Sequence, residues 1–104
     1  MTARHATEYG AFAIDQAPNQ SQLAICHSFH IRPEHRSLGK AHHLKAYQQD
    51  KLAAGGYDYA ICTTCGANQR QHKVLESAGW QRLVEFGNSA TGGTTILWGW
   101  RVDS

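Results

Sequence analysis

The 104-residue sequence is poor in charge and in proline, and its three cysteines are an odd number. Charged residues make up 17% of the chain, and the formal charge of +2 at pH 7 is spread along it, so we do not expect binding to nucleic acid. An odd number of cysteines argues against a disulfide framework. The sequence has no run long enough to cross a membrane and no signal-peptide pattern, which predicts a cytoplasmic protein without membrane contact.

What the chain does contain is apolar and aromatic surface. Hydrophobic residues are 41% of the total and include three tryptophans, four tyrosines and three phenylalanines, so a buried core can form. Two separate cores need a longer chain, and we therefore expect residues 1–104 to form a single domain. A homodimer would be compatible with so small a core.

Alternating and helical patterns predict a mixed α/β fold. Two β-prone segments flank a polar turn at Asn19 and are expected to form a hairpin. In the second of these, 23–31, odd-numbered residues should share one face of the strand and even-numbered residues the other. The predicted order is β-β-α-β-α-β-β, over 9–15, 23–31, 39–54, 57–64, 69–78, 81–86 and 94–102.

The second predicted helix carries signals at both ends. Asn68 suits the N-cap, and Gln71 stands at the position of its capping-box partner. Gly79 can adopt the left-handed conformation after the helix, which lets Trp80 pack on Leu75 in a Schellman ending.

The segment from Arg36 to Ala41 lies between a predicted strand and a predicted helix. A helix N-terminus presents unpaired N–H groups and a partial positive charge, so it favours anions such as a pyrophosphate. Gly39 permits close approach of the backbone, while Arg36 and Lys40 add positive charge.

Arg36-x-x-Gly39-x-Ala41 resembles the coenzyme A motif of the GNAT superfamily of N-acetyltransferases. Asn68 and the later Gly79 stand where that superfamily has its second conserved segment, and the likeness covers about 23–102. It implies a GNAT-like mixed sheet that lacks the superfamily's usual N-terminal strand and helices, which form part of the acceptor-site floor. A large acceptor, such as a protein, then becomes more credible than a small one.

The resemblance implies acetyl-coenzyme A as cosubstrate and a primary amine as acceptor. The pantetheine arm would lie where the strands 23–31 and 57–64 splay apart, with backbone groups near 29–31 polarising the thioester carbonyl. The residues that the resemblance places on the coenzyme are Phe29, His30, Ile31, Arg36, Ser37, Leu38, Gly39, Lys40, Ala41, Asn68 and Lys73.

The residues for acid and base chemistry are less clear in the sequence. Leu75 stands where many relatives carry a tyrosine that protonates the leaving thiolate. No carboxylate lies in 23–31, so His27 and His30 are the candidate catalytic bases there. A histidine on a mostly apolar strand face, as His27 is, is more often a packed side chain with a satisfied hydrogen bond than a catalyst.

Alternative functions remain open at this stage. The protein could be a coenzyme-binding or partner-binding protein that keeps the fold without turnover. Cys62-x-x-Cys65, with Cys26 on the preceding strand, has the spacing of a metal site, but a lone pair of this kind favours packed thiols, and no metal is expected. Trp98 and Trp100 are expected in the core or at a subunit interface.

Overall fold

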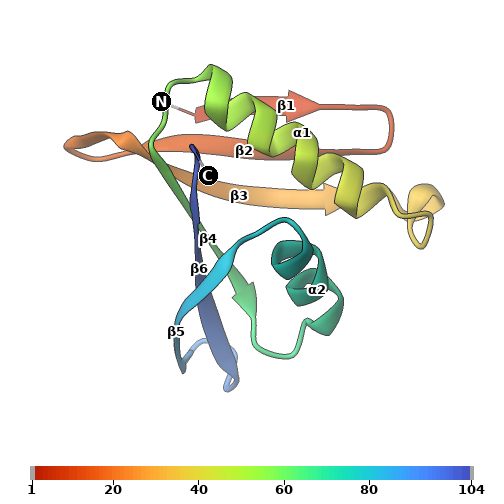
Figure 1. Ribbon diagram of the computed structural model, residues 1–104. Helices are drawn as coiled ribbons and strands as arrows, with labels where there is room; N and C mark the ends of the chain where they lie inside the picture. The colour runs from red at the N-terminus through yellow and green to blue at the C-terminus, as the bar shows by residue number, and fades with distance from the viewer. Residues whose placement is uncertain (1, 104) are drawn as a thin grey trace.

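The chain folds as one mixed β-sheet with two helices packed against it (Figure 1). The computed structural model describes residues 2–103. The elements are β1 (Thr2–Ala6), β2 (Gly10–Ala17), β3 (Gln20–Ile31), a 3-10 turn η1 (Pro33–His35), α1 (Lys40–Ala54), β4 (Tyr59–Cys65), α2 (Gln69–Ser77), β5 (Gln81–Gly87) and β6 (Thr94–Arg101). The sheet order is β1-β2-β3-β4-β6-β5, which confirms the mixed α/β class.

Strand β1 is an element that the sequence analysis did not predict. It pairs antiparallel with β2, from Thr2 opposite Asp15 to Ala6 opposite Ala11. Its residues are mostly exposed and show no apolar alternation. Its strand conformation therefore depends on the edge of β2, which a local pattern cannot reveal.

The predicted hairpin is confirmed, with β2 and β3 antiparallel and Asn19 in the turn at φ 61°. The predicted faces of β3 are wrong beyond residue 27. Ser28 has φ 58°, and the register shifts here, so that two residues of β3 oppose one of β2 in a β-bulge. As a result Phe29 and Ile31 pack against the same core as the even-numbered Cys26.

The two neighbouring parallel strands separate as predicted. Pairing of β3 with β4 covers only Leu23–Ile25 against Tyr59–Ile61, although both strands continue beyond these residues. A gap therefore opens between the carboxyl-terminal halves of β3 and β4.

The caps of α2 are confirmed. The Asn68 Oδ1 atom accepts a hydrogen bond from the Gln71 N–H at 3.3 Å. The Asn68 N–H donates to the Cys65 carbonyl at 3.1 Å, so this backbone bond takes the place of the returning bond of a capping box. At the other end Gly79 has φ 90°, and the Trp80 N–H donates to the Leu75 carbonyl at 3.0 Å, as in a Schellman motif.

Both helices cover the same face of the sheet, as is shown by the one buried cluster to which side chains of each helix belong. Gln49 of α1 also donates to the Ala78 carbonyl at the end of α2 at 2.8 Å. Trp98 is fully buried, as expected, and its indole N–H donates to Thr64 at 2.9 Å. Within residues 2–103, neither helix is both long and apolar enough to cross a membrane. The buried cluster consists of Phe12, Ile14, Ala24, Cys26, Leu44, Leu52, Ala60, Cys62, Leu75, Trp80, Ile96 and Trp98.

Candidate functional site

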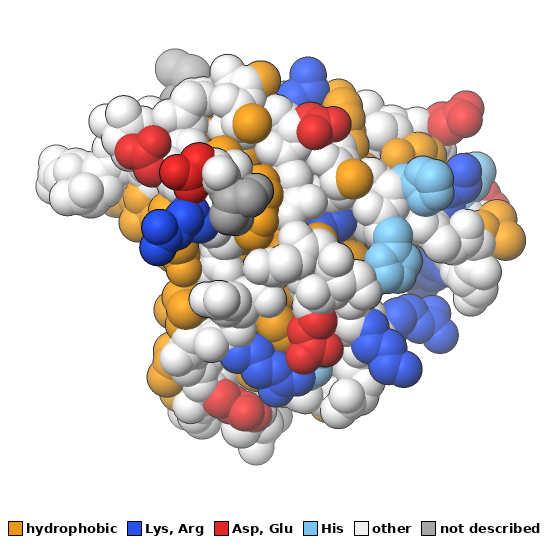
Figure 2. Space-filling view, in the orientation of Figure 1, with side chains coloured by type: hydrophobic (Ala, Val, Ile, Leu, Met, Phe, Trp, Pro, Cys, Tyr) orange, Lys and Arg blue, Asp and Glu red, His pale blue; other side chains and the backbone are white. Residues whose placement is uncertain are grey.

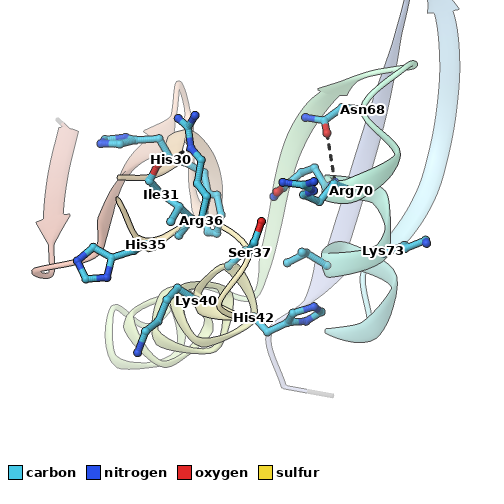
Figure 3. Close-up of a pocket in the computed structure, with 15 residues that line it drawn as sticks. His30, Ile31, His35, Arg36, Ser37, Lys40, His42, Asn68, Arg70 and Lys73 are labelled. Atoms are coloured by element: carbon cyan, nitrogen blue, oxygen red, sulfur yellow. Dashed lines mark hydrogen bonds between the residues drawn. The ribbon is translucent and has the colours of Figure 1, made fainter. Parts of the chain in front are cut away.

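A cavity of about 640 Å³ lies where the end of β3, the start of α1 and the start of α2 meet (Figure 3). The loop that bounds it turns sharply, because Ser37 and Gly39 both have positive φ values, of 68° and 74°. These conformations bring the N-terminus of α1 to the cavity wall. The lining residues are Phe29, His30, Ile31, His35, Arg36, Ser37, Gly39, Lys40, Ala41, His42, Asn68, Arg70, Gln71, Lys73 and Val74.

All but one of the residues that the sequence placed on the coenzyme line this cavity. The exception is Leu38, whose side chain is 63% exposed and does not contribute to the lining. Other lining residues were not predicted from the sequence, and of these Arg70 has the most evident chemistry. Arg70 lies in the first turn of α2, two residues after the Asn68 cap. The N-terminus of a helix attracts anions, so a cation in this turn was a usable signal in the sequence.

The cavity is rich in positive charge. Its lining contains arginine, lysine and histidine side chains but no aspartate or glutamate. In the space-filling view, Lys, Arg and His side chains gather on the side of the molecule where this cavity lies (Figure 2). A cavity of this composition at a helix N-terminus favours an anionic ligand.

The individual cations are not equally placed. The Arg36 Nε atom donates to the Ile31 carbonyl at 3.1 Å, which holds the guanidinium beside the cavity. Figure 3 shows Arg70 facing Ser37 across the cavity, whereas Lys73 points away from it. The Lys40 ammonium lies over the Tyr9 ring, 5.2 Å from its centre, and is likewise directed away.

A second cavity, of about 320 Å³, occupies the gap between β3 and β4. It shares Phe29, Asn68 and Gln71 with the first cavity, so the two adjoin. Together they lead from the N-terminus of α1 into the separated part of the sheet. The lining consists of Cys26, His27, Ser28, Phe29, Lys45, Gln48, Cys62, Thr63, Thr64, Cys65, Asn68 and Gln71.

The two candidate histidines lie in different cavities. His27 lines the second, with its Nε2 atom 2.7 Å from the Asp15 carboxylate and its Nδ1 atom 2.9 Å from the Ser28 hydroxyl. His30 lines the first, and its Nδ1 atom lies 3.1 Å from the Ser28 carbonyl. The carboxylate that β3 lacks is therefore supplied by β2.

The electrostatic surroundings of Asp15 favour its charged form. A hydrogen bond from Thr2 is the main cause of a lowered pKa. Burial is the next largest effect and opposes it, while the hydrogen bond and charge of His27 lower the pKa further. An ionised Asp15 is suited to accept a hydrogen bond from the Nε2–H of His27, and the Nδ1 atom is then the hydrogen-bond acceptor of the ring.

The cysteines do not assemble a metal site within residues 2–103. Cys26 and Cys62 are buried and Cys65 is exposed, and no three His, Cys, Asp or Glu side chains among the described residues are placed to hold an ion. Burial raises the pKa of Cys26 to about 12 and also raises that of Cys62. Both thiols are therefore neutral linings of the second cavity.

Leu75 is fully buried in the core cluster and lines neither cavity. It can supply no proton to a leaving group. Its contribution is to the packing under α2.

No family model matches the sequence, and no curated protein sequence matches it either. Solved structures do match. An IAA acetyltransferase from Bacillus cereus has a TM-score of 0.79 and 8% identity, over 89% of this chain and 69% of that one. A chimeric spermidine N-acetyltransferase from Vibrio cholerae and hSSAT has a TM-score of 0.82 and 13% identity, over 98% and 68%. An acetyltransferase of the GNAT family from Streptococcus pneumoniae has a TM-score of 0.77 and 15% identity, over 89% and 59%.

The protein therefore has the fold of the GNAT N-acetyltransferases. It spans between 59% and 69% of the length of these three chains. The TM-scores establish the fold, and at these low identities they establish the fold alone, so the chemistry has to be argued from the site.

Proposed function

We propose that the protein binds acetyl-coenzyme A in the two adjoining cavities and transfers its acetyl group to a primary amine. The observation that carries this proposal is the continuity of a cationic cavity at the N-terminus of α1 with a gap between two parallel strands. The first suits a pyrophosphate, and the second suits a narrow arm that ends in a thioester.

The residues of the first cavity would bind the anionic part of the coenzyme. Backbone N–H groups after Gly39, together with Arg36 and Arg70, would face the phosphates. Asn68 stands where the two cavities meet, so it would contact the arm rather than the phosphates. Backbone groups of 29–31 would hold the arm and polarise the thioester carbonyl.

His27 is the better candidate for the base that accepts the proton of the attacking amine. Its side chain is 39% exposed, it lines the second cavity, and Asp15 fixes its orientation. With Asp15 accepting from the Nε2–H, the Nδ1 atom carries the lone pair that would take the proton, once its 2.9 Å contact with the Ser28 hydroxyl gives way to the amine. His30 lines the cavity assigned to the phosphates and is a weaker candidate.

The acceptor is proposed only as a primary amine. The departing thiolate needs no dedicated acid, since a thiol has a pKa of about 8.5 in water and water can return the proton.

A protein that binds the coenzyme without turnover is the alternative, and the burial of Leu75 away from the site supports it.

Release of free coenzyme A thiol in the presence of spermidine or of peptides with a free N-terminus distinguishes an acetyltransferase from a protein that only binds the coenzyme. We expect amine-dependent release that His27→Gln slows by at least about 10-fold. The matched control is His30→Gln, which should retain most of the rate. Equal thiol release in wild type, in His27→Gln and in samples without an amine would contradict acetyl transfer and support a protein that only binds the coenzyme.

A further inference from the structure

Lys45 lies inside the molecule without a carboxylate partner. It is on α1, its side chain is 2% exposed, and it lines the second cavity between β3 and β4. Its ammonium nitrogen lies 4.4 Å from the centre of the Phe29 ring and 4.8 Å from that of the Trp80 ring. No ion pair that the structure shows within residues 2–103 includes it. Lysines are almost never this buried without a counter-charge, which marks Lys45 as a functional candidate.

Gln48, one turn along α1, supplies a second and independent observation. Its side chain is fully buried, and its Oε1 atom accepts a hydrogen bond from the Lys45 Nζ at 2.8 Å. Its Nε2 atom is also buried and has no partner, and Gln48 is among the residues that line the same cavity. A buried amide N–H without an acceptor carries a cost of about 1 to 3 kcal/mol, so an acceptor group of a ligand would relieve it.

We propose that Lys45 is an internal acetyl acceptor, whose Nζ takes the acetyl group of acetyl-coenzyme A seated in the adjoining cavities. The inference rests on the coenzyme binding of the proposed function, but it does not depend on the identity of the external amine. Gln48 is the positioning residue, because its unpartnered N–H is available to the acetyl carbonyl oxygen.

The step balances without any further reactant. The lone pair of the neutral Lys45 amine attacks the carbonyl carbon and forms the C–N bond. The C–S bond breaks with its electron pair on sulfur, and the proton lost from nitrogen ends on the coenzyme thiol. The products are acetyl-lysine and free coenzyme A.

Burial of Lys45 favours the neutral amine that this step needs, whereas the ring faces of Phe29 and Trp80 favour the cation. Burial is the main cause of a lowered pKa, and it outweighs the opposing influence of Cys62 and Cys26. That opposing influence requires thiolates, and burial raises the pKa of both cysteines, so as neutral thiols they supply no negative counter-charge. Conversion of the amine to an amide also removes the cost of burying a charge.

The location of the cavity distinguishes Lys45 from the other lysines. Lys40 and Lys51 lie over the rings of Tyr9 and Tyr47, and neither lines the second cavity. Lys73 lines only the first cavity. These three lysines are internal controls for non-selective chemical acetylation in the same sample.

The test is to incubate the wild-type chain with acetyl-coenzyme A at pH near 8 and to follow intact mass and peptide maps with time. We expect one acetyl group per chain, on Lys45, with release of an equal amount of free thiol. Gln48→Leu should slow the modification by at least about 10-fold, because it removes the amide N–H that would donate to the acetyl carbonyl oxygen. The matched control Gln81→Leu changes an exposed amide on β5 that lines neither cavity and should leave the rate unchanged.

The decisive readout is in the wild-type protein, so it does not require a Lys45 variant to fold. Native mass spectrometry of the same samples reports coenzyme binding. An unmodified Lys45 in a chain that visibly binds acetyl-coenzyme A overturns the inference and leaves the proposed function in place. Equal acetylation of Lys40, Lys51 and Lys73, or an unchanged pattern after heat denaturation, also overturns it. Absence of both binding and modification overturns the two proposals together.

Discussion

Asp15 and His27, on the adjacent strands β2 and β3, are joined by a 2.7 Å contact between Oδ2 and Nε2. The Thr2 hydrogen bond, and after it this contact, hold the pKa of Asp15 below its usual 3.8. Since the pKa of Asp15 is lower in the folded than in the unfolded chain, the ionised carboxylate stabilises the fold above the unfolded-state pKa. That stabilisation is lost as pH falls through the folded-state pKa.

Asp15→Asn should therefore flatten the acid limb of the curve of melting temperature against pH, below about pH 4. Thermal melts followed by circular dichroism measure the effect. The matched control is Asp50→Asn, at an exposed position on α1, which should keep the acid limb of the wild type. If both variants follow the wild-type curve, the pair does not contribute to acid stability.

Gly39 begins α1 with φ 74°, and no atom lies within 4 Å of the point where a β-carbon would stand. Bulk at this position is therefore directed into open space at the cavity, and the protein itself does not exclude it. Asn and Asp both tolerate the left-handed conformation better than other residues, and both cap helices. The variants Gly39→Asn and Gly39→Asp therefore differ mainly in the negative charge of the aspartate.

Gly39→Asp should weaken acetyl-coenzyme A binding by at least about 10-fold relative to Gly39→Asn, because its charge faces the phosphates. Titration calorimetry on both folded variants measures the difference. Equal dissociation constants would place the phosphates elsewhere.

Arg70 faces the cavity, whereas Lys40 is directed to Tyr9. Arg70→Ala should therefore cost about 1.5 kcal/mol of binding free energy or more, as for a charge-assisted hydrogen bond. Lys40→Ala should cost about 1 kcal/mol or less, and added salt should reduce it further. Calorimetric titrations at two salt concentrations give the ranking. A larger loss for Lys40→Ala would show that Arg70 does not contact the anion.

Leu75 is fully buried beneath α2, and Leu38 is 63% exposed. Leu75→Ala should lower the free energy of unfolding by about 2 to 5 kcal/mol through lost packing, and Leu38→Ala by about 0.5 kcal/mol or less. Urea denaturation measures both. A Leu75→Ala protein of wild-type stability that binds no coenzyme would indicate a direct role that the structure does not assign to it.

Features with local causes were predictable from the sequence. The caps of α2 depend on Asn68 and Gly79 alone, and the turn before α1 depends on Gly39, so nearby residues are enough to define them. The cavity lining at 36–41 follows from the same local geometry. Leu38 differs because its neighbours turn it outward, and motif position does not specify side-chain direction.

Features with distant causes were not predictable in this way. Strand β1 depends on its pairing with β2, and the bulge at Ser28 changes the faces of β3 through a register shift. Lys45 and Gln48 lie on the buried side of α1 next to Leu44 and Leu52, where the helical period places them. Their burial could not be predicted from the sequence, because lysine and glutamine side chains are usually exposed.

The central claim is that the folded chain binds acetyl-coenzyme A. A ligand that binds only the folded state at about 100 times its dissociation constant stabilises it by about 2.7 kcal/mol. Thermal melts with and without acetyl-coenzyme A, alongside native mass spectrometry, test this directly. We predict a raised melting temperature and a one-to-one adduct for wild type. An unchanged melting temperature without an adduct at saturating acetyl-coenzyme A and coenzyme A would contradict it.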